Sequence, residues 1–115
     1  MKDDEVHLLH ILQEADFIIH TAKGLEFEAI MADEALKRAI VWSLEMIGEA
    51  SRNISTRFKE MHREIEWSEL ASLRDKLTNR YFEVKWKRVW DAITTLIPDL
   101  KPQIETLLKG EEPAG

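Results

Sequence analysis

The stretch DEALKRAIVWSLEMIGEASRNISTRF, from Asp33 to Phe58, decides the fold class of this 115-residue chain. Each of its apolar residues has another one three or four positions away, which is the spacing of one buried face of an α-helix; they are Ala35, Ala39, Trp42, Leu44, Met46, Ile47 and Ala50. Asp33 is placed to cap this helix, because its carboxylate can accept a hydrogen bond from a free N–H of the first turn. We therefore predict one long helix from Asp33 to about Phe58.

The helical period continues on both sides of this stretch, and no part of the chain is typical of a strand. The predicted neighbours are a helix over 5–23 stopped by Gly24, one from Trp67 to between 80 and 83, one over 85–96 that Pro98 ends or kinks, and a short one from Pro102. We expect an all-α, up-and-down antiparallel helical bundle of four main helices plus a short C-terminal helix. Residues 1–110 would form one domain and residues 111–115 a flexible tail.

Composition excludes several kinds of chemistry. The chain has no cysteine, so disulfides, thiol nucleophiles and cysteine-based zinc sites are absent. No stretch approaches the roughly 18 apolar residues of a membrane span, and the N-terminus lacks the basic flank and apolar run of a signal peptide. We expect a cytoplasmic protein that makes no membrane contact.

The net charge of −6 is unevenly distributed. Residues 74–88, which we call the basic segment, contain six basic and two acidic residues and carry +4, so the other hundred residues carry −10. This pattern would steer a polyanion to one region of the surface. A cluster of this kind is also compatible with an ordinary solvated helix face.

The sequence RDKLTNRYFEV over residues 74–84, the motif segment, resembles the signature of HepT-like proteins of the HEPN superfamily. In that signature an Arg is followed after four residues by His, then by one residue and Tyr; Arg74 and Tyr81 match, and Asp75 fits the polar residue that usually follows the Arg. Further matches span most of the chain: Ile47-Gly48-Glu49-Ala50, Trp67, Val89-Trp90 and Ile97-Pro98-Asp99-Leu100. One position departs from the pattern, because Asn79 stands where the family has its histidine.

The resemblance implies a homodimeric helical bundle that acts as a metal-independent ribonuclease, the toxin of a toxin–antitoxin pair. It implies no cofactor, RNA as the substrate, and as antitoxin a small nucleotidyltransferase of the MNT type that attaches AMP to the motif tyrosine. Carried onto this chain, Arg74 and Asn79 occupy the catalytic positions, Asp75 orients the motif and Tyr81 accepts AMP. Glu49 and Arg80 are candidates for the same cleft.

Asn79 leaves two functions open. Cleavage of RNA ordinarily uses a group with a pKa near 7, and an amide does not titrate, so activity is expected to be weak or lost unless another group substitutes. His62 is the candidate substitute. The alternative is a non-catalytic nucleotide- or RNA-binding subunit of a nucleotidyltransferase complex; a bundle that only oligomerises would leave the motif unexplained.

Overall fold

The computed structural model describes residues 2–73, 75, 78–80 and 83–111, and in them the chain is almost entirely helical, as predicted. It extends 48 × 29 × 20 Å. The elements are α1 (Lys2–Ala22), α2 (Phe27–Met31), α3 (Glu34–Asn53), α4 (Thr56–Met61), α5 (Trp67–Ala71), β1 (Thr78–Arg80), β2 (Glu83–Val84), α7 (Trp86–Asp91), the π-helical turn η1 (Ala92–Leu96) and α8 (Ile97–Glu111). None of the described helices is long and apolar enough to cross a membrane.

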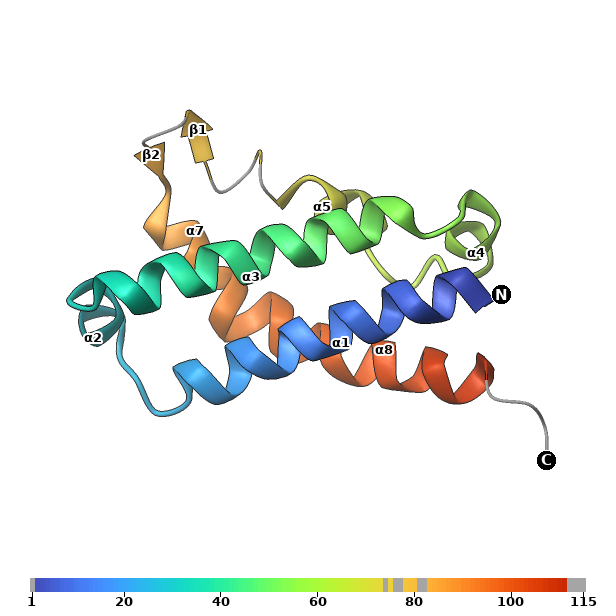
Figure 1. Cartoon of the computed structure of the whole chain (residues 1–115), viewed down its shortest axis with the longest axis horizontal. Coiled ribbons are helices and arrows are strands. Elements are labelled where there is room, and N and C mark those ends of the chain that lie inside the picture. Colours follow the sequence, from blue (N-terminus) through green and yellow to red (C-terminus); the bar gives the residue numbers. More distant parts are fainter. Residues whose placement is uncertain (1, 74, 76–77, 81–82, 112–115) are drawn as a thin grey trace.

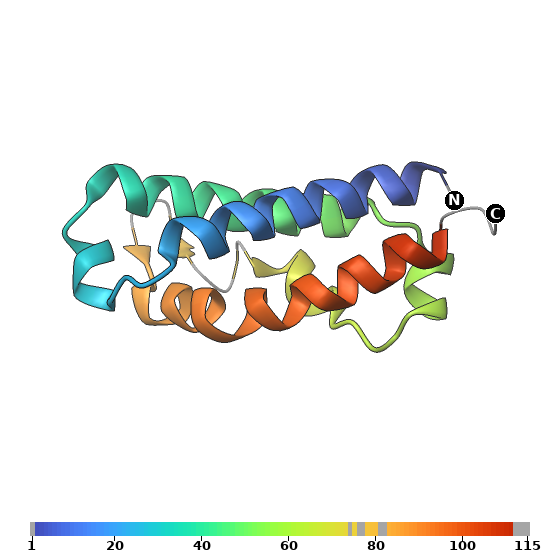
Figure 2. The same ribbon diagram turned by 90° about the horizontal axis from the view of Figure 1, so that it is seen from below.

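The core lies between α1, α3 and α8. Figure 1 shows α1 running against α3, while α7, η1 and α8 form one continuous rod (Figures 1 and 2). Their facing side chains are almost fully buried: Leu8, Ile11, Ile18, Ile40, Leu44, Ile47, Ile97 and Ile104. Burial of each such side chain contributes about 1.5–3 kcal/mol, so this three-helix core dominates the stability of the fold.

The predicted helix over 33–58 begins where expected but ends early. Asp33 caps α3, its Oδ1 accepting a hydrogen bond from the Leu36 N–H at 3.0 Å. The helix stops at Asn53, and Ile54 and Ser55 are extended before α4 begins. Ser55 ends the long helix because its hydroxyl caps α4, accepting from the Phe58 N–H at 3.2 Å, while its own N–H is bound by the distant Asp4.

The predicted third helix, from Trp67 to between 80 and 83, ends earlier than expected. Helical residues are described in α5, from Trp67 to Ala71, and at Leu73 and Asp75, whereas residues 78–80 and 83–84 form the short antiparallel pair β1–β2 in place of helix. The helical prediction rested on three leucines, and beyond them the sequence changes to polar, β-branched and aromatic residues, which favour extended backbone. The elements described between α4 and α7 are short, so the predicted arrangement of four main helices is not confirmed.

Pro98 and Pro102 do not delimit helices as predicted. The chain stays helical through both, and the expected short fifth helix is part of α8. The π turn η1 precedes Pro98, and its last bond runs from the Ile97 N–H to the Ala92 carbonyl. A π turn shifts the hydrogen-bond register by one residue, which accommodates a proline that has no N–H to offer. Of the predicted tail, residues 112–115 lie outside the described residues.

Candidate functional site

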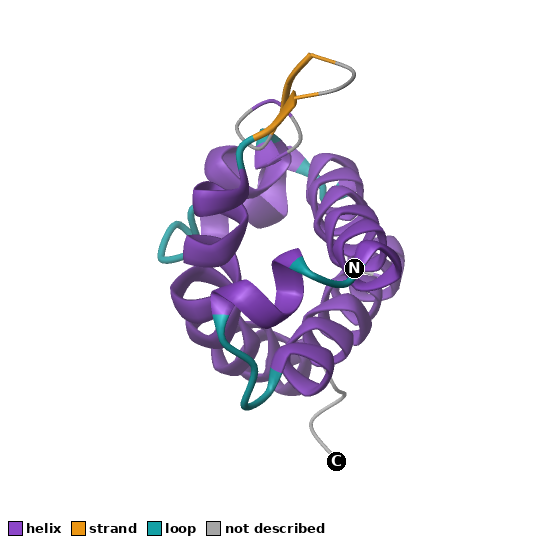
Figure 3. Ribbon diagram, turned by 90° about the vertical axis from the view of Figure 1, so that its left-hand side faces the viewer, coloured by secondary structure: helices purple, strands orange, loops and turns teal. Residues whose placement is uncertain are grey.

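The motif segment joins the end of α5 to the start of α7, and its hairpin projects from the side of the bundle above α3 (Figures 1 and 3). Asn79 and Arg80 lie on β1, where Thr78 pairs with Val84 and Arg80 with Glu83. Arg74 and Tyr81 lie outside the described residues. The site is therefore located through its described neighbours: the α3 surface beneath it and the elements on both sides.

Helix α3 holds the start of the motif segment through a close crossing at Gly48. A Cβ at this position would meet the Leu70 carbonyl oxygen at 3.1 Å and the Ala71 oxygen at 3.7 Å. Glycine inside a helix costs about 1 kcal/mol relative to alanine, and here it lets the backbone of α5 approach α3 directly. The crossing explains the Ile47-Gly48-Glu49-Ala50 match in the sequence.

Arg52, one turn further along α3, binds the start of the motif segment. Its Nε donates to the Ala71 carbonyl at 2.9 Å, and its Nη2 lies 3.9 Å from Oδ2 of Asp75. Asp75 is exposed, so this ion pair is screened by solvent, and the hydrogen bond to the C-terminal end of α5 is the stronger contact. Sequence reasoning missed Arg52; its position three residues after Glu49, on the same helix face, is the only signal that pointed to it.

Glu49 is exposed and lies beside this anchor. With Arg52 and Ala71 it lines a small hollow of about 80 Å³. The structure thus places Glu49 next to residues that hold the motif segment.

A second hollow, of about 460 Å³, lies at the other end of the motif segment, between α3 and the β2–α7 junction. We call it the Trp42 hollow; its lining includes Glu34, Lys37, Arg38, Trp42, Glu45, Val84 and Trp86. Lys37 Nζ lies 5.1 Å from the centre of the Trp86 ring and 2.7 Å from Oε1 of Glu34. The hydrogen bond from Lys37 and the Lys37 charge lower the pKa of the Glu34 carboxyl, so the carboxylate stays ionised and the positive charge of Lys37 balances it.

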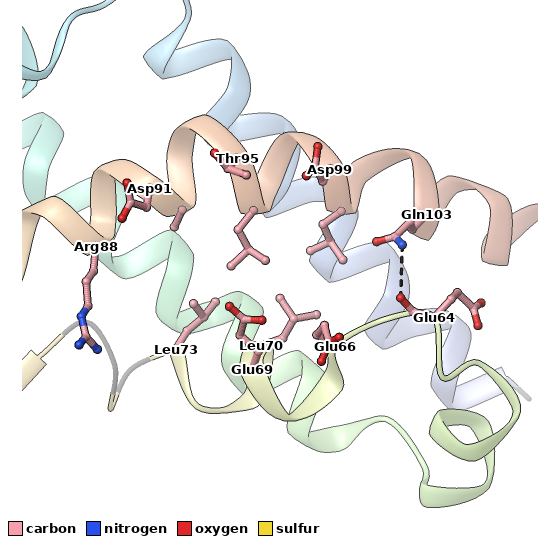
Figure 4. A pocket seen from close by; sticks show the side chains of 13 residues that line it. Glu64, Glu66, Glu69, Leu70, Leu73, Arg88, Asp91, Thr95, Asp99 and Gln103 are labelled. Carbon is pink, nitrogen blue, oxygen red and sulfur yellow. Dashed lines mark hydrogen bonds between the residues drawn. The ribbon is translucent and has the colours of Figure 1, made fainter.

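A third hollow, of about 530 Å³, lies between α5 and the η1–α8 rod, and Figure 4 shows the side chains that line it. We call it the acidic groove. Leu70, Leu73, Leu96 and Leu100 provide apolar lining. Among the described residues, the lining has Arg88 as its one basic residue and five carboxylates: Glu64, Glu66, Glu69, Asp91 and Asp99. This groove repels a polyanion, although it adjoins the basic segment.

His62 does not lie beside the hairpin. It follows α4, towards the other end of the long axis from β1 (Figures 1 and 2). Its ring packs on Phe58, with centroids 4.4 Å apart, and Nδ1 lies 3.5 Å from Oε1 of Glu64. Within one chain His62 is therefore not placed to replace the missing histidine. Among the described residues no three His, Cys, Asp or Glu side chains are grouped to hold a metal ion.

Comparison with known proteins identifies the family. The family model described as "Ribonuclease HepT-like" matches residues 11–107. A protein of Caldanaerobacter subterraneus subsp. tengcongensis named "Putative RNase" is 43% identical, over 97% of this chain and all of its own length. A "Putative RNase" of Methanocaldococcus jannaschii is 37% identical, over 96% of this chain and 92% of its own.

A "Probable ribonuclease HepT" of Thermococcus cleftensis is 38% identical, over 90% of this chain and 94% of its own. No solved structure matches the chain significantly. The helical fold, the Arg-to-Tyr spacing of the motif segment and these matches over nearly the whole chain agree with one another. The chain belongs to the HepT-like ribonuclease family.

Proposed function

We propose that this chain is the toxin component of a toxin–antitoxin pair, with an RNA-directed site on the motif segment whose cleavage step is weakened by Asn79. The observation that carries the proposal is the +4 basic segment, standing on a chain that is otherwise −10, at the position of the family motif. The names of the relatives support RNA as the substrate. A local positive charge of this kind is enough to steer RNA, a polyanion, to the segment, even though the rest of the chain is negative.

The proposed roles follow from the chemistry of RNA cleavage. The 2′-hydroxyl must lose a proton as it attacks the phosphorus, the charge on the pentacovalent phosphate must be stabilised, and the leaving 5′-oxygen must gain a proton. Arg74 suits the second role, because a guanidinium stays charged and grips phosphate oxygens with two N–H groups. Asn79 can orient the phosphate through its amide but can move no proton.

Restoring the histidine tests this assignment. The Asn79→His variant should cleave single-stranded RNA about 10²- to 10⁴-fold faster than the wild type, the range that an acid–base group contributes. The gain should disappear in the Arg74→Ala, Asn79→His double variant, which keeps the histidine but loses the phosphate-binding group. Equal cleavage by the wild type and Asn79→His would remove position 79 from the mechanism.

The partner is proposed to be a small nucleotidyltransferase that attaches AMP to Tyr81, and the chain itself is proposed to be a homodimer acting in the cytoplasm. The adjacent gene should encode this enzyme. Expression of the chain alone should arrest growth, with relief by the partner. Mass spectrometry of the co-expressed pair should find the adenylyl group on Tyr81 and none in Tyr81→Phe; an unmodified Tyr81 beside an active nucleotidyltransferase would contradict the assignment.

Asn79 also favours a second candidate, a non-catalytic RNA-binding subunit of the same complex. In this case RNA binds through the basic segment, but neither the wild type nor Asn79→His cleaves it. The same cleavage assay, run beside a binding assay, separates the two functions.

A further inference from the structure

Trp42 differs from the other three tryptophans of the chain in its surroundings. Trp67 is buried, and its Nε1 donates to the His62 carbonyl at 2.8 Å. Trp86 and Trp90 pack against the core, the first under Lys37 and the second edge-on to Phe27. Trp42, in the middle of α3, is 58% exposed instead. Within the described part of the chain, its indole has no hydrogen bond or ring contact.

Trp42 is exposed beside the motif segment. It lines the Trp42 hollow together with Val84 of β2 and Trp86 of α7, so one side of it borders the hairpin that carries Asn79, while another side shares a separate hollow with Phe17 of α1. Arg38 lies one turn earlier on the same face of α3 and also lines this hollow. Its side chain is 85% exposed, and its contact with Glu34 is long, 3.9 Å. An aromatic face and a guanidinium therefore lie side by side next to the proposed site.

Charge selects the side of the motif segment from which RNA can approach. In the part of the chain that the structure describes, the acidic groove places five carboxylates against Arg88, an arrangement that repels phosphate. The Trp42 hollow has two carboxylates and two basic residues, and the Glu34 carboxylate is already paired with Lys37 at 2.7 Å. RNA bound at the basic segment is thus directed along α3.

Glu45 determines which part of the RNA fits this hollow. Its carboxylate shares the lining with Trp42, so a phosphate placed against the indole would be repelled. A base has no net charge, and any of the four bases can stack on an aromatic ring. One such stacking interaction contributes about 1–3 kcal/mol to the free energy of RNA binding. The hollow therefore suits an unpaired base, with its phosphate turned outward to Arg38.

We propose that Trp42 and Arg38 form a single-stranded RNA subsite, in which Trp42 stacks on an unpaired base next to the phosphate bound by the motif segment and Arg38 contacts the adjoining phosphate. The subsite rests on the proposed function, because it takes RNA to be the substrate. It makes the protein selective for single strands over duplexes, since a paired and stacked base cannot turn its face to the indole.

Fluorescence anisotropy with labelled single-stranded RNA tests the subsite across a salt series. Trp42→Ala should weaken binding about 5- to 150-fold, the equivalent of one lost stacking interaction, and leave the salt dependence unchanged. Trp42→Phe should restore most of the affinity. Arg38→Ala should lower the slope of log K against log salt by about 0.7, the value for one phosphate contact to a single strand. Phe17→Ala is the control for the surface on the other side of Trp42, because Phe17 is 41% exposed on α1 and shares a separate hollow with Trp42 but does not line the Trp42 hollow.

The outcomes are distinguishable. If the wild type binds single-stranded RNA and Trp42→Ala binds it equally well, the subsite is wrong and the proposed function stands. If the wild type binds no RNA, both are wrong. If Trp42→Ala and Phe17→Ala both change the molar mass measured by light scattering and affect RNA binding equally, the exposed aromatic residues form a protein contact and the subsite is overturned.

Discussion

Asp4 ties the first turn of α1 to the junction between α3 and α4. Its side chain is only 2% exposed, and its two oxygens accept hydrogen bonds from the backbone N–H of Ser55 at 2.7 Å and from the Ser55 hydroxyl at 2.8 Å. The same hydroxyl oxygen accepts from the Phe58 N–H and caps α4. Residues 51 positions apart are therefore joined through one carboxylate.

Replacement of Asp4 by alanine should be strongly destabilising. A hydrogen bond to a charged acceptor contributes about 1.5–3 kcal/mol, and two such bonds to one partly exposed residue are not fully additive. We expect Asp4→Ala to lower the free energy of unfolding by about 2–4 kcal/mol. With a urea m-value of about 1–2 kcal/mol/M, the midpoint should fall by about 1–4 M in denaturation followed by circular dichroism.

Asp3→Ala is the matched control, because Asp3 is an exposed acidic residue in the same first turn. It loses only a favourable interaction with the helix dipole, about 0.3–1 kcal/mol. Ser55→Ala completes a double-mutant cycle with Asp4→Ala, and the coupling should exceed about 1 kcal/mol. If Asp4→Ala costs no more than Asp3→Ala, the hydrogen bonds to Ser55 add nothing net and the reasoning is refuted.

Three further predictions concern the motif segment and the surface of α3. Arg52→Ala should speed amide hydrogen exchange in α5 and lower RNA affinity, whereas Asp75→Ala should change the free energy of unfolding by less than about 1 kcal/mol because its ion pair is exposed. Gly48→Val should destabilise the protein by about 1–3 kcal/mol in urea denaturation, since its side chain would press on the Leu70 carbonyl; an unchanged midpoint would deny the close crossing. The interactions that lower the pKa of Glu34 stabilise the fold above about pH 4.5, its unfolded value, and this contribution is lost as the pH falls through the lower folded value. The melting temperatures of Glu34→Gln and the wild type should therefore differ at about pH 7 and converge once the pH lies below the folded pKa.

Local signals in the sequence were enough where one residue sets an element boundary. Asp33 caps α3 as predicted, and Gly24, with a φ of +75°, follows α1 in the left-handed conformation that glycine favours. The break at Ser55 could not be predicted in the same way, because it depends on Asp4, 51 residues away. The prediction that Pro98 ends or kinks a helix was wrong for a related reason, because the π turn that accommodates this proline has no sequence signature of its own.

The residues of the candidate site also fall into those that the sequence could predict and those that it could not. The spacing from Arg74 to Tyr81 locates the motif segment on the chain, and Glu49 does lie near its anchor. Arg52 and Trp42 could not be identified from the sequence, because their importance comes from what α5 and β2 place opposite them. A periodic pattern indicates which face of a helix is buried and gives no information on which exposed residue lies beneath a loop.

The π turn η1 lets the rod of α7 and α8 hold one more residue without turning the hairpin. In a regular helix each residue turns the chain by about 100°, so one added residue would rotate everything beyond it by that angle. A π turn spreads a single turn over one more residue, so η1 takes up that residue within Ala92–Leu96 and keeps α7 and α8 in phase. Deleting one residue within η1 should therefore leave the direction of the hairpin nearly unchanged, whereas the same deletion in the regular part of α7 would rotate the hairpin about the helix axis.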